Sequence, residues 1–203
     1  MVESQPATIS FREMALFSFR RLDIDPLSVA MAGVKLGERL LQIGIDDTAR
    51  AGQIAVKTGL SGSAAHVVSN DDDAVKVNRS AKKAGVLVEV RVGPLDRLPF
   101  DDSAFDLVVI HSARGQLASA SADERNAVLQ ACLRVLRPGG RVLTIEPGTS
   151  TGLRSMLRSA PAAQAAYDAG GGSSAALRQA GFNAVRDLGD REATKFVEGL
   201  KTT

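Results

Sequence analysis

The sequence contains a single cysteine, Cys132, and only two histidines, His66 and His111, among 203 residues. One thiol cannot build a disulfide framework, and these scattered nitrogen and sulfur ligands cannot supply a zinc site, so no structural metal is expected. Cys132 falls within a helical pattern. We therefore expect a buried thiol in the reducing environment of a cytoplasm.

Long apolar runs and an excess of one charge are also missing. No stretch is long enough to cross a bilayer, and the N-terminus, MVESQPATISFREMALF, lacks the basic-then-apolar order of a signal peptide. Lys and Arg total 25 against 23 Asp and Glu, which gives a net charge of +2. This balance does not indicate nucleic acid or an anionic membrane as a partner, and we expect a soluble, cytoplasmic protein.

What is present is the pattern of one α/β domain. Hydrophobic residues make up 44% of the chain, and strand-like runs alternate with helical patterns. This alternation predicts a doubly wound, mainly parallel sheet with helices on both faces. The predicted strands are 39–43, 65–69, 86–92, 105–110, 141–145, 183–188 and 194–200, and the last two should form an antiparallel hairpin through Gly189-Asp190. The predicted helices are 48–57, 71–85, 122–136, 151–168 with an interruption at Pro161, and 173–179.

Residues 1–34 are expected to form an N-terminal helical segment, separate from the main domain at 35–203. A mixed helical pattern covers 10–21 and ends near the Asp25-Pro26 step, and a second short helix is predicted over 27–34. Such a segment could close over a ligand at the sheet or pack on its edge, and the packing role is the simpler interpretation.

The chain is organised around the stretch KLGERLLQIGIDDTARAGQIAV, in which an apolar strand reaches Gly44 and then turns into a helix. A strand-loop-helix unit of this kind presents backbone N–H groups and the positive end of a helix dipole to a ligand. Residues 42–48 are therefore the first place to expect a binding site.

Read onward from this loop, the sequence resembles the class I S-adenosylmethionine (SAM) dependent methyltransferases. Five blocks carry the resemblance, in order and over about four-fifths of the chain: KLGERLLQIG, AHVVSND, LPFDDSAFDLVV, LRVLRPGGRVLTIEP and LRQAGFNAV. The resemblance implies a seven-stranded sheet that ends in an antiparallel hairpin, with SAM bound at the ends of the first strands.

The resemblance also shows where this chain departs from the family's first motif. The family has an acidic residue at the end of the first strand, where this chain has Gln42, and it has glycines after Gly44 where this chain has Asp46 and Thr48. Asp46 would add a negative charge near the carboxylate of the ligand, which would cost about 3 kcal/mol at ~5 Å and an effective dielectric of ~20. Restoring Asp at 42 and Gly at 46 and 48 is therefore predicted to raise SAM affinity.

Other cofactor positions of the family have counterparts here. Asp71, after the second strand, matches the acid that accepts hydrogen bonds from the ribose hydroxyls. Leu95 falls where it would line the adenine pocket. Together with Gln42, Gly44 and Asp46, these are the cofactor-binding residues that the resemblance implies.

Two functions remain open from the sequence. The chain could be a SAM-dependent methyltransferase in which His111, at the end of the fourth strand, is the general base for an acceptor of low acidity. His111 could instead only form hydrogen bonds within its loop. Alternatively, the fold could be a non-catalytic interaction or regulatory subunit that has lost SAM binding. A nicotinamide-dependent oxidoreductase is disfavoured because the loop lacks G-x-G-x-x-G. The sequence does not define a methyl acceptor or a protein partner.

Overall fold

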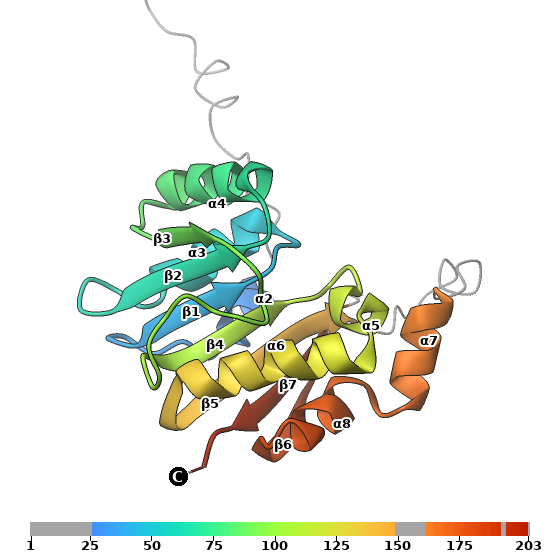
Figure 1. The fold of residues 1–203 in the computed structure, drawn as a ribbon. Coiled ribbons are helices and arrows are strands. Elements are labelled where there is room, and N and C mark those ends of the chain that lie inside the picture. The colour runs from blue at the N-terminus through green and yellow to red at the C-terminus, as the bar shows by residue number, and fades with distance from the viewer. Residues whose placement is uncertain (1–25, 149–160, 192–193, 203) are drawn as a thin grey trace, which may run out of the picture.

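A computed structural model describes residues 26–148, 161–191 and 194–202 as one seven-stranded sheet flanked by helices (Figure 1). The strands follow the spatial order β3-β2-β1-β4-β5-β7-β6. Their bounds are Arg39–Ile43 (β1), Ser63–Val68 (β2), Glu89–Val92 (β3), Phe105–His111 (β4), Leu136–Pro147 (β5), Asn183–Arg191 (β6) and Thr194–Leu200 (β7). Strands β1 to β5 pair in parallel, and β7 runs antiparallel to both β5 and β6, as the sequence predicts.

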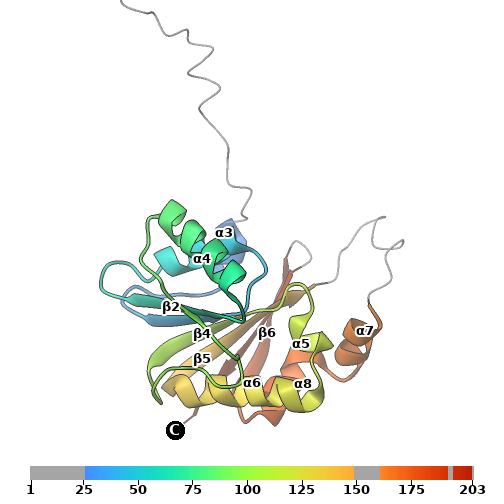
Figure 2. The ribbon, with the colours of Figure 1, turned by 45° about the horizontal axis from the view of Figure 1, so that its top comes forward.

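Helices cover both faces of this sheet (Figures 1 and 2). The helices are Pro26–Ala30 (α2), Thr48–Val56 (α3), Asp71–Ala84 (α4), Gln116–Ser119 (α5), Ala122–Val135 (α6), Ala162–Ala169 (α7) and Gly172–Gln179 (α8). On one face, Ile43 and Ile110 belong to an apolar cluster with side chains of α6 and α8. On the other face, Leu40 and Val109 pack with side chains of α2 and α3. Alternate strand residues therefore build two separate cores.

Most element boundaries follow from local sequence. Helix α4 begins after the N-cap Asn70 and ends at Gly85, which takes the left-handed conformation with φ 73°. Helix α6 begins with a complete capping box in which Ser121 and Glu124 exchange hydrogen bonds. These short-range signals are visible in the sequence, so the start of α4 and the extent of α6 agree with the prediction within one residue.

Strands β3 and β5 differ from their predicted lengths. The predicted strand 86–92 is only Glu89–Val92, because β3 is an edge strand with one neighbour and mostly exposed side chains. Strand β5 is longer than 141–145 and runs from Leu136 to Pro147, because the Pro-Gly-Gly stretch stays within the sheet and pairs with Lys201. Helix α5 is one turn long and was not predicted.

The position of the final turn was also predicted wrongly. The hairpin does not reverse at Gly189-Asp190, since Gly189 pairs with Phe196 and Arg191 pairs with Thr194. Gly189 has φ 126° and lies at a register shift, so it marks a bulge inside the hairpin. Strand β6 ends at Arg191 and β7 begins at Thr194, and residues 192–193 are outside the described residues.

The helical segment predicted over 1–34 lies mostly outside the described residues, including all of 10–21. Its described part is the short helix α2, which buries Val29 against the sheet, followed by a turn that buries Ala32. The predicted helix 151–168 is described only after residue 160, where α7 follows Pro161.

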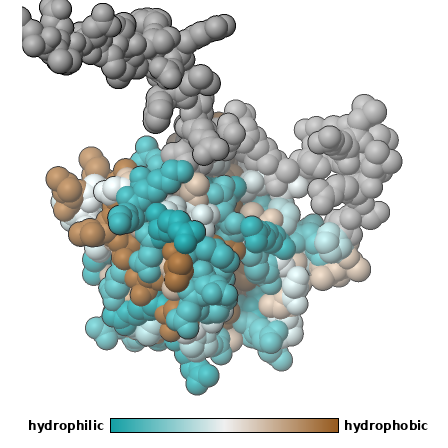
Figure 3. Space-filling view, turned by 90° about the horizontal axis from the view of Figure 1, so that it is seen from above, coloured by the Kyte–Doolittle hydropathy of each residue, from teal (hydrophilic) through white to brown (hydrophobic). Residues whose placement is uncertain are grey.

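The two ends of the strands have different surfaces. Leu36, Leu60 and Leu87 are 80%, 108% and 94% exposed, and each precedes a strand, β1, β2 or β3. Hydrophobic surface gathers on the side of the molecule where β2 begins (Figure 3). In the described part of the chain, no helix has the length and apolar character that a membrane span requires. The same residues contain no cluster of three metal-ligating side chains.

Candidate cofactor site

A cavity of about 380 Å³ opens where β1 and β4 end. Its apolar wall comes from Ile43, Val68, Leu95, Ile110 and Leu117. Polar groups of the loops after the strands complete it, among them Gly44, Ser69, Asp73, Ser112, Arg114 and Gln116. A concave site with a mainly apolar wall and a few polar groups is typical of small-molecule binding. The crevice outside the carboxyl ends of parallel strands is also where doubly wound folds bind their ligands.

Gly44 is required at the turn after β1. Its φ is 72°, a conformation that side chains rarely adopt, and a Cβ atom there would lie 3.0 Å from the carbonyl oxygen of His111. The Gly44 N–H donates to the carbonyl oxygen of Val67 at 3.0 Å, which ties the turn to β2. The helix α3 that follows is capped by Asp47, whose carboxylate accepts from the N–H groups of Ala49 and Arg50.

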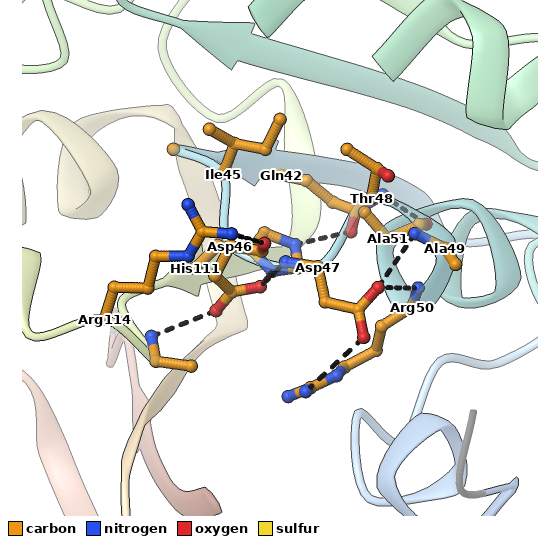
Figure 4. A network of polar contacts seen from close by, with 12 residues as sticks. Gln42, Ile45, Asp46, Asp47, Thr48, Ala49, Arg50, Ala51, His111 and Arg114 are labelled. Carbon is orange, nitrogen blue, oxygen red and sulfur yellow. Dashed lines mark hydrogen bonds and ion pairs between the residues drawn. The ribbon is translucent and has the colours of Figure 1, made fainter. Parts of the chain in front are cut away.

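Gln42 and His111 are joined directly beneath this loop (Figure 4). The Gln42 Nε2 donates to the carbonyl oxygen of Ala51 at 3.0 Å, which fixes the orientation of the amide. The Gln42 Oε1 then faces His111 Nε2 at 2.8 Å and can only accept. His111 Nε2 therefore carries a hydrogen atom.

The other ring nitrogen of His111 faces Asp46. Its Nδ1 lies 3.1 Å from Asp46 Oδ1, and both side chains are almost fully buried, at 0% and 3% exposed. The Asp46 carboxylate also accepts from the backbone N–H groups of Asp47 and, at 3.0 Å, of Ala113. Both His111 nitrogens thus face side-chain oxygens, and the histidine links Gln42 on β1 to Asp46 in the loop that follows.

Electrostatics agree with this arrangement. Burial raises the pKa of Asp46, but the hydrogen bond and charge of His111 and the two backbone N–H groups outweigh it and hold that pKa well below its usual value. The sequence predicts that Asp46 repels an anionic ligand. In the structure Asp46 is not among the residues that line the cavity, and its carboxylate contacts His111 and two backbone N–H groups; its effect on a ligand stays a prediction.

His66 belongs to the same network and contacts both Gly44 and His111. Its Nε2 donates to the carbonyl oxygen of Gly44 at 2.6 Å, and its ring stacks on His111 with centroids 5.7 Å apart. Burial, together with the charge of His111, lowers the pKa of His66 to about 3, although the Gly44 hydrogen bond and Asp46 act in the opposite direction. His66 is therefore neutral at physiological pH, with its hydrogen on Nε2.

The loop after β4 is fastened to the loop after β1. Arg114 Nη2 donates to the carbonyl oxygen of Asp46 at 3.1 Å, and Gln116 Nε2 donates to that of Ile45 at 3.0 Å. Gln116 Oε1 in turn accepts from the backbone N–H of Arg114 at 3.1 Å. These contacts close one side of the cavity without any ligand.

The sequence-predicted site residues take different positions. Gly44, Leu95 and His111 contribute to the cavity wall. Gln42 and Asp46 lie behind it as parts of the buried network. The two His111 nitrogens contact Gln42 and Asp46, and the role of His111 as a general base stays a prediction.

Asp71 does not reach the cavity. It is the first residue of α4 and is exposed, whereas Asp73, two residues later, lines the cavity. A hydrogen bond from Lys76 at 2.7 Å lowers the pKa of Asp73, so this carboxylate is ionised. Successive residues of a helix point in different directions, so only one of the three consecutive aspartates faces the cavity. The N-cap Asn70 marks where the helix begins, and that start could have been used to identify the inward residue.

Two other buried polar groups lie apart from the cavity wall. Cys132 is a buried thiol, as expected, and burial raises its pKa to about 12. Burial also raises the pKa of Glu146, at the end of β5, where Ser173 donates to its carboxyl group. Tyr167 contacts the same serine at 3.0 Å, so this cluster fastens α7 and α8 to the sheet.

The fold and the position of this cavity define a Rossmann-like domain of the class that binds a nucleoside cofactor at its strand ends. A family model described as a methyltransferase domain matches residues 41–144, just over half of the chain, which includes β1, β4 and the Gly44 loop. The chain belongs to the class I SAM-dependent methyltransferase family.

Curated relatives include the ubiquinone/menaquinone biosynthesis C-methyltransferase UbiE of Idiomarina loihiensis, which is 31% identical over 123 residues. That match covers 59% of this chain and 46% of the relative, so the chain matches less than half of the relative's length. Among solved structures, a SAM-dependent methyltransferase from Aquifex aeolicus has a TM-score of 0.67 at 17% identity and covers 87% of this chain and 88% of its own. PigF with SAH has a TM-score of 0.58 at 18% identity and covers 86% and 54%. At these identities the structures support the fold alone.

Proposed function

We propose that this chain binds SAM in the cavity beside Gly44 and transfers its methyl group to an acceptor. The observation that carries the proposal is the preformed cavity at the ends of β1 and β4, with a glycine turn open to a ligand, inside a methyltransferase domain. Gln42 and Asp46, which depart from the family's first motif, are compatible with this proposal. Both contact His111 and neither occupies the cavity.

The adenine and the ribose of SAM both have complementary groups in the proposed site. Val68, Leu95 and Ile110 offer an apolar wall for the adenine ring. Asp73 and Ser69 offer oxygen acceptors for the ribose hydroxyls. We assign this role to Asp73 in place of Asp71, because only Asp73 lines the cavity.

When bound, SAM supplies an electrophilic methyl group on a sulfonium, and its transfer breaks the carbon–sulfur bond and leaves S-adenosylhomocysteine (SAH). The chain's own contribution is to hold the reacting atoms in line, which can supply much of the rate enhancement of such a displacement. The fastened loops after β1 and β4 serve this purpose, since they fix one wall of the cavity before the ligand binds.

Calorimetric titration of the purified chain with SAM and SAH tests the binding step. A matched pair of variants locates it: Ala120→Trp fills part of the cavity wall, whereas Leu87→Trp adds the same ring at an exposed position before β3. Ala120→Trp should weaken binding more than tenfold, and Leu87→Trp should bind as the wild type does. Equal binding by both variants would place SAM elsewhere.

The matched region contains the cavity, so the comparisons support the methyl donor more strongly than any acceptor. The curated relatives named as ubiquinone/menaquinone C-methyltransferases make the demethylated precursors of those quinones the first acceptors to test. Transfer of a radioactive methyl group from SAM to such a precursor, absent in the Ala120→Trp variant, would support both donor and acceptor.

A further inference from the structure

The cavity wall contains an arginine whose charge is not neutralised by an ion pair. Arg114 lines the cavity, and its guanidinium donates from Nη2 to the carbonyl oxygen of Asp46 at 3.1 Å. No carboxylate among the described residues lies within ion-pair distance of its guanidinium. A guanidinium has five N–H donors, so most of them are available to a ligand.

The position of Arg114 is fixed by its neighbours. Its backbone N–H donates to Gln116 Oε1, and the amide of Gln116 donates to Ile45. The adjacent Ala113 N–H donates to the carboxylate of Asp46. The guanidinium is therefore held over the turn that follows β1.

The carboxylates near Arg114 bond to other groups. Asp73, also in the cavity wall, interacts electrostatically with Arg114 but takes its hydrogen bonds from Lys76 and Asn70. Asp46 gives Arg114 only its carbonyl oxygen, because its carboxylate is paired with His111. Arg125, the other arginine in the described cavity wall, already donates to the carbonyl oxygens of Leu117 and Ala120 and lies 4.7 Å above the Tyr167 ring. Arg114 is thus the better placed of the two to receive an anion.

We propose that Arg114 binds the carboxylate of the methionine portion of SAM, so that the site recognises the anionic end of the ligand. This inference rests on the proposed SAM binding. Gln42 is bonded to Ala51 and His111, so Arg114, at the loop after β1, is the group assigned to the anionic end of the ligand. The planar fork of arginine suits a carboxylate, which it can bind through two parallel hydrogen bonds.

The test compares two ligands that differ only in this carboxylate: SAH and decarboxylated SAH, in which a hydrogen replaces the carboxyl group. Calorimetry would measure both with the wild type, with Arg114→Gln and with Arg79→Gln, which removes an equal charge from an exposed position on α4. The wild type should bind SAH about tenfold more tightly, as expected for a charge-assisted hydrogen bond at an accessible site. Arg114→Gln should remove this preference and leave the affinity for decarboxylated SAH unchanged, and Arg79→Gln should change neither.

The possible failures are distinguishable. If the wild type binds both ligands equally, or if Arg114→Gln weakens both by the same factor, Arg114 only supports the loop and the inference is overturned. If the wild type binds neither ligand, the proposed function itself fails and the inference fails with it. Arg114→Lys adds a further check: it keeps the charge but loses the fork, so it should retain part of the preference for SAH.

Discussion

His111 Nδ1 lies 3.1 Å from Asp46 Oδ1, and this buried contact joins the loop after β1 to the end of β4. It explains how a methyltransferase domain can keep its cofactor loop in place without the acid and the two later glycines of the family's first motif. The Asp46 carboxylate belongs to the loop and contacts Nδ1 of His111, and Gln42 Oε1 contacts the second ring nitrogen, Nε2.

The first prediction concerns the carboxylate of Asp46. Asp46→Ala should lower the free energy of unfolding by about 3 kcal/mol, because it leaves the imidazole of His111 buried without its partner. SAM affinity should fall as well, since the loop loses its anchor. Urea denaturation and calorimetry measure the two effects, with the exposed Asp72→Ala as the control. Unchanged stability would show that the pair does not hold the loop.

The second prediction reverses the expectation from sequence for the triple change Gln42→Asp, Asp46→Gly, Thr48→Gly. The family motif alone predicts a gain in SAM affinity. The structure predicts a loss. The triple variant removes the Asp46 carboxylate that contacts His111 Nδ1, and it replaces the Gln42 amide that contacts His111 Nε2. Titration of the triple variant with SAM decides between the two, and a tighter complex than that of the wild type would contradict the role of this network.

The third prediction follows from His66. Its pKa is lowered to about 3 in the folded state, so between pH 6.5 and about 3 the unfolded chain binds more protons than the folded one. The free energy of unfolding should therefore fall as the pH drops below 6.5. His66→Gln can still donate to the Gly44 carbonyl and should lose less stability between pH 7 and pH 5 in urea titrations.

This pH window isolates the histidine from Asp46. The pKa of Asp46 is lowered from 3.8, so its stabilising contribution is fully present at pH 5 and is lost only at stronger acid. An equal loss of stability in wild type and His66→Gln between pH 7 and pH 5 would mean that His66 is not the group responsible.

The fourth prediction concerns the thiol of Cys132, which is fully buried in α6 and has a pKa raised to about 12. The reactive species of a cysteine is the thiolate. Cys132 should not react with a thiol reagent in the native protein and should react fully in denaturant. Rapid labelling of the native chain would show that α6 opens easily from the sheet.

The sequence predicts the fold well because the fold depends on local signals. Apolar runs identify the strands, and Asn70, Gly85 and Ser121 fix helix ends through contacts within a few residues. The errors fall where strand pairing between distant residues sets the end of an element. Strand β5 is longer than predicted because it pairs with Lys201, and Gly189 lies inside the hairpin because it pairs with Phe196.

The site is less predictable for a physical reason. The turn at Gly44 can be found from the residues around it, but the direction of Asp46 depends on His111, which lies 65 residues away in sequence. The inward side chain of α4 depends on helical phase, which placed Asp73 and not Asp71 in the cavity wall. Arg114 and Gln116 have no motif of their own and acquire meaning only from the loop that they contact.

The central claim is that SAM binds at the ends of β1 and β4. Backbone amide spectra of the ¹⁵N-labelled chain, recorded during titration with SAH, test it most directly. The account predicts that the amides of Gly44, Leu95 and Leu117, which line the cavity, shift with one saturating dependence on SAH, while those of Leu36 and Leu60 at the opposite ends of the strands do not. Shifts confined to residues outside the cavity, or no shifts at saturating SAH, would contradict it.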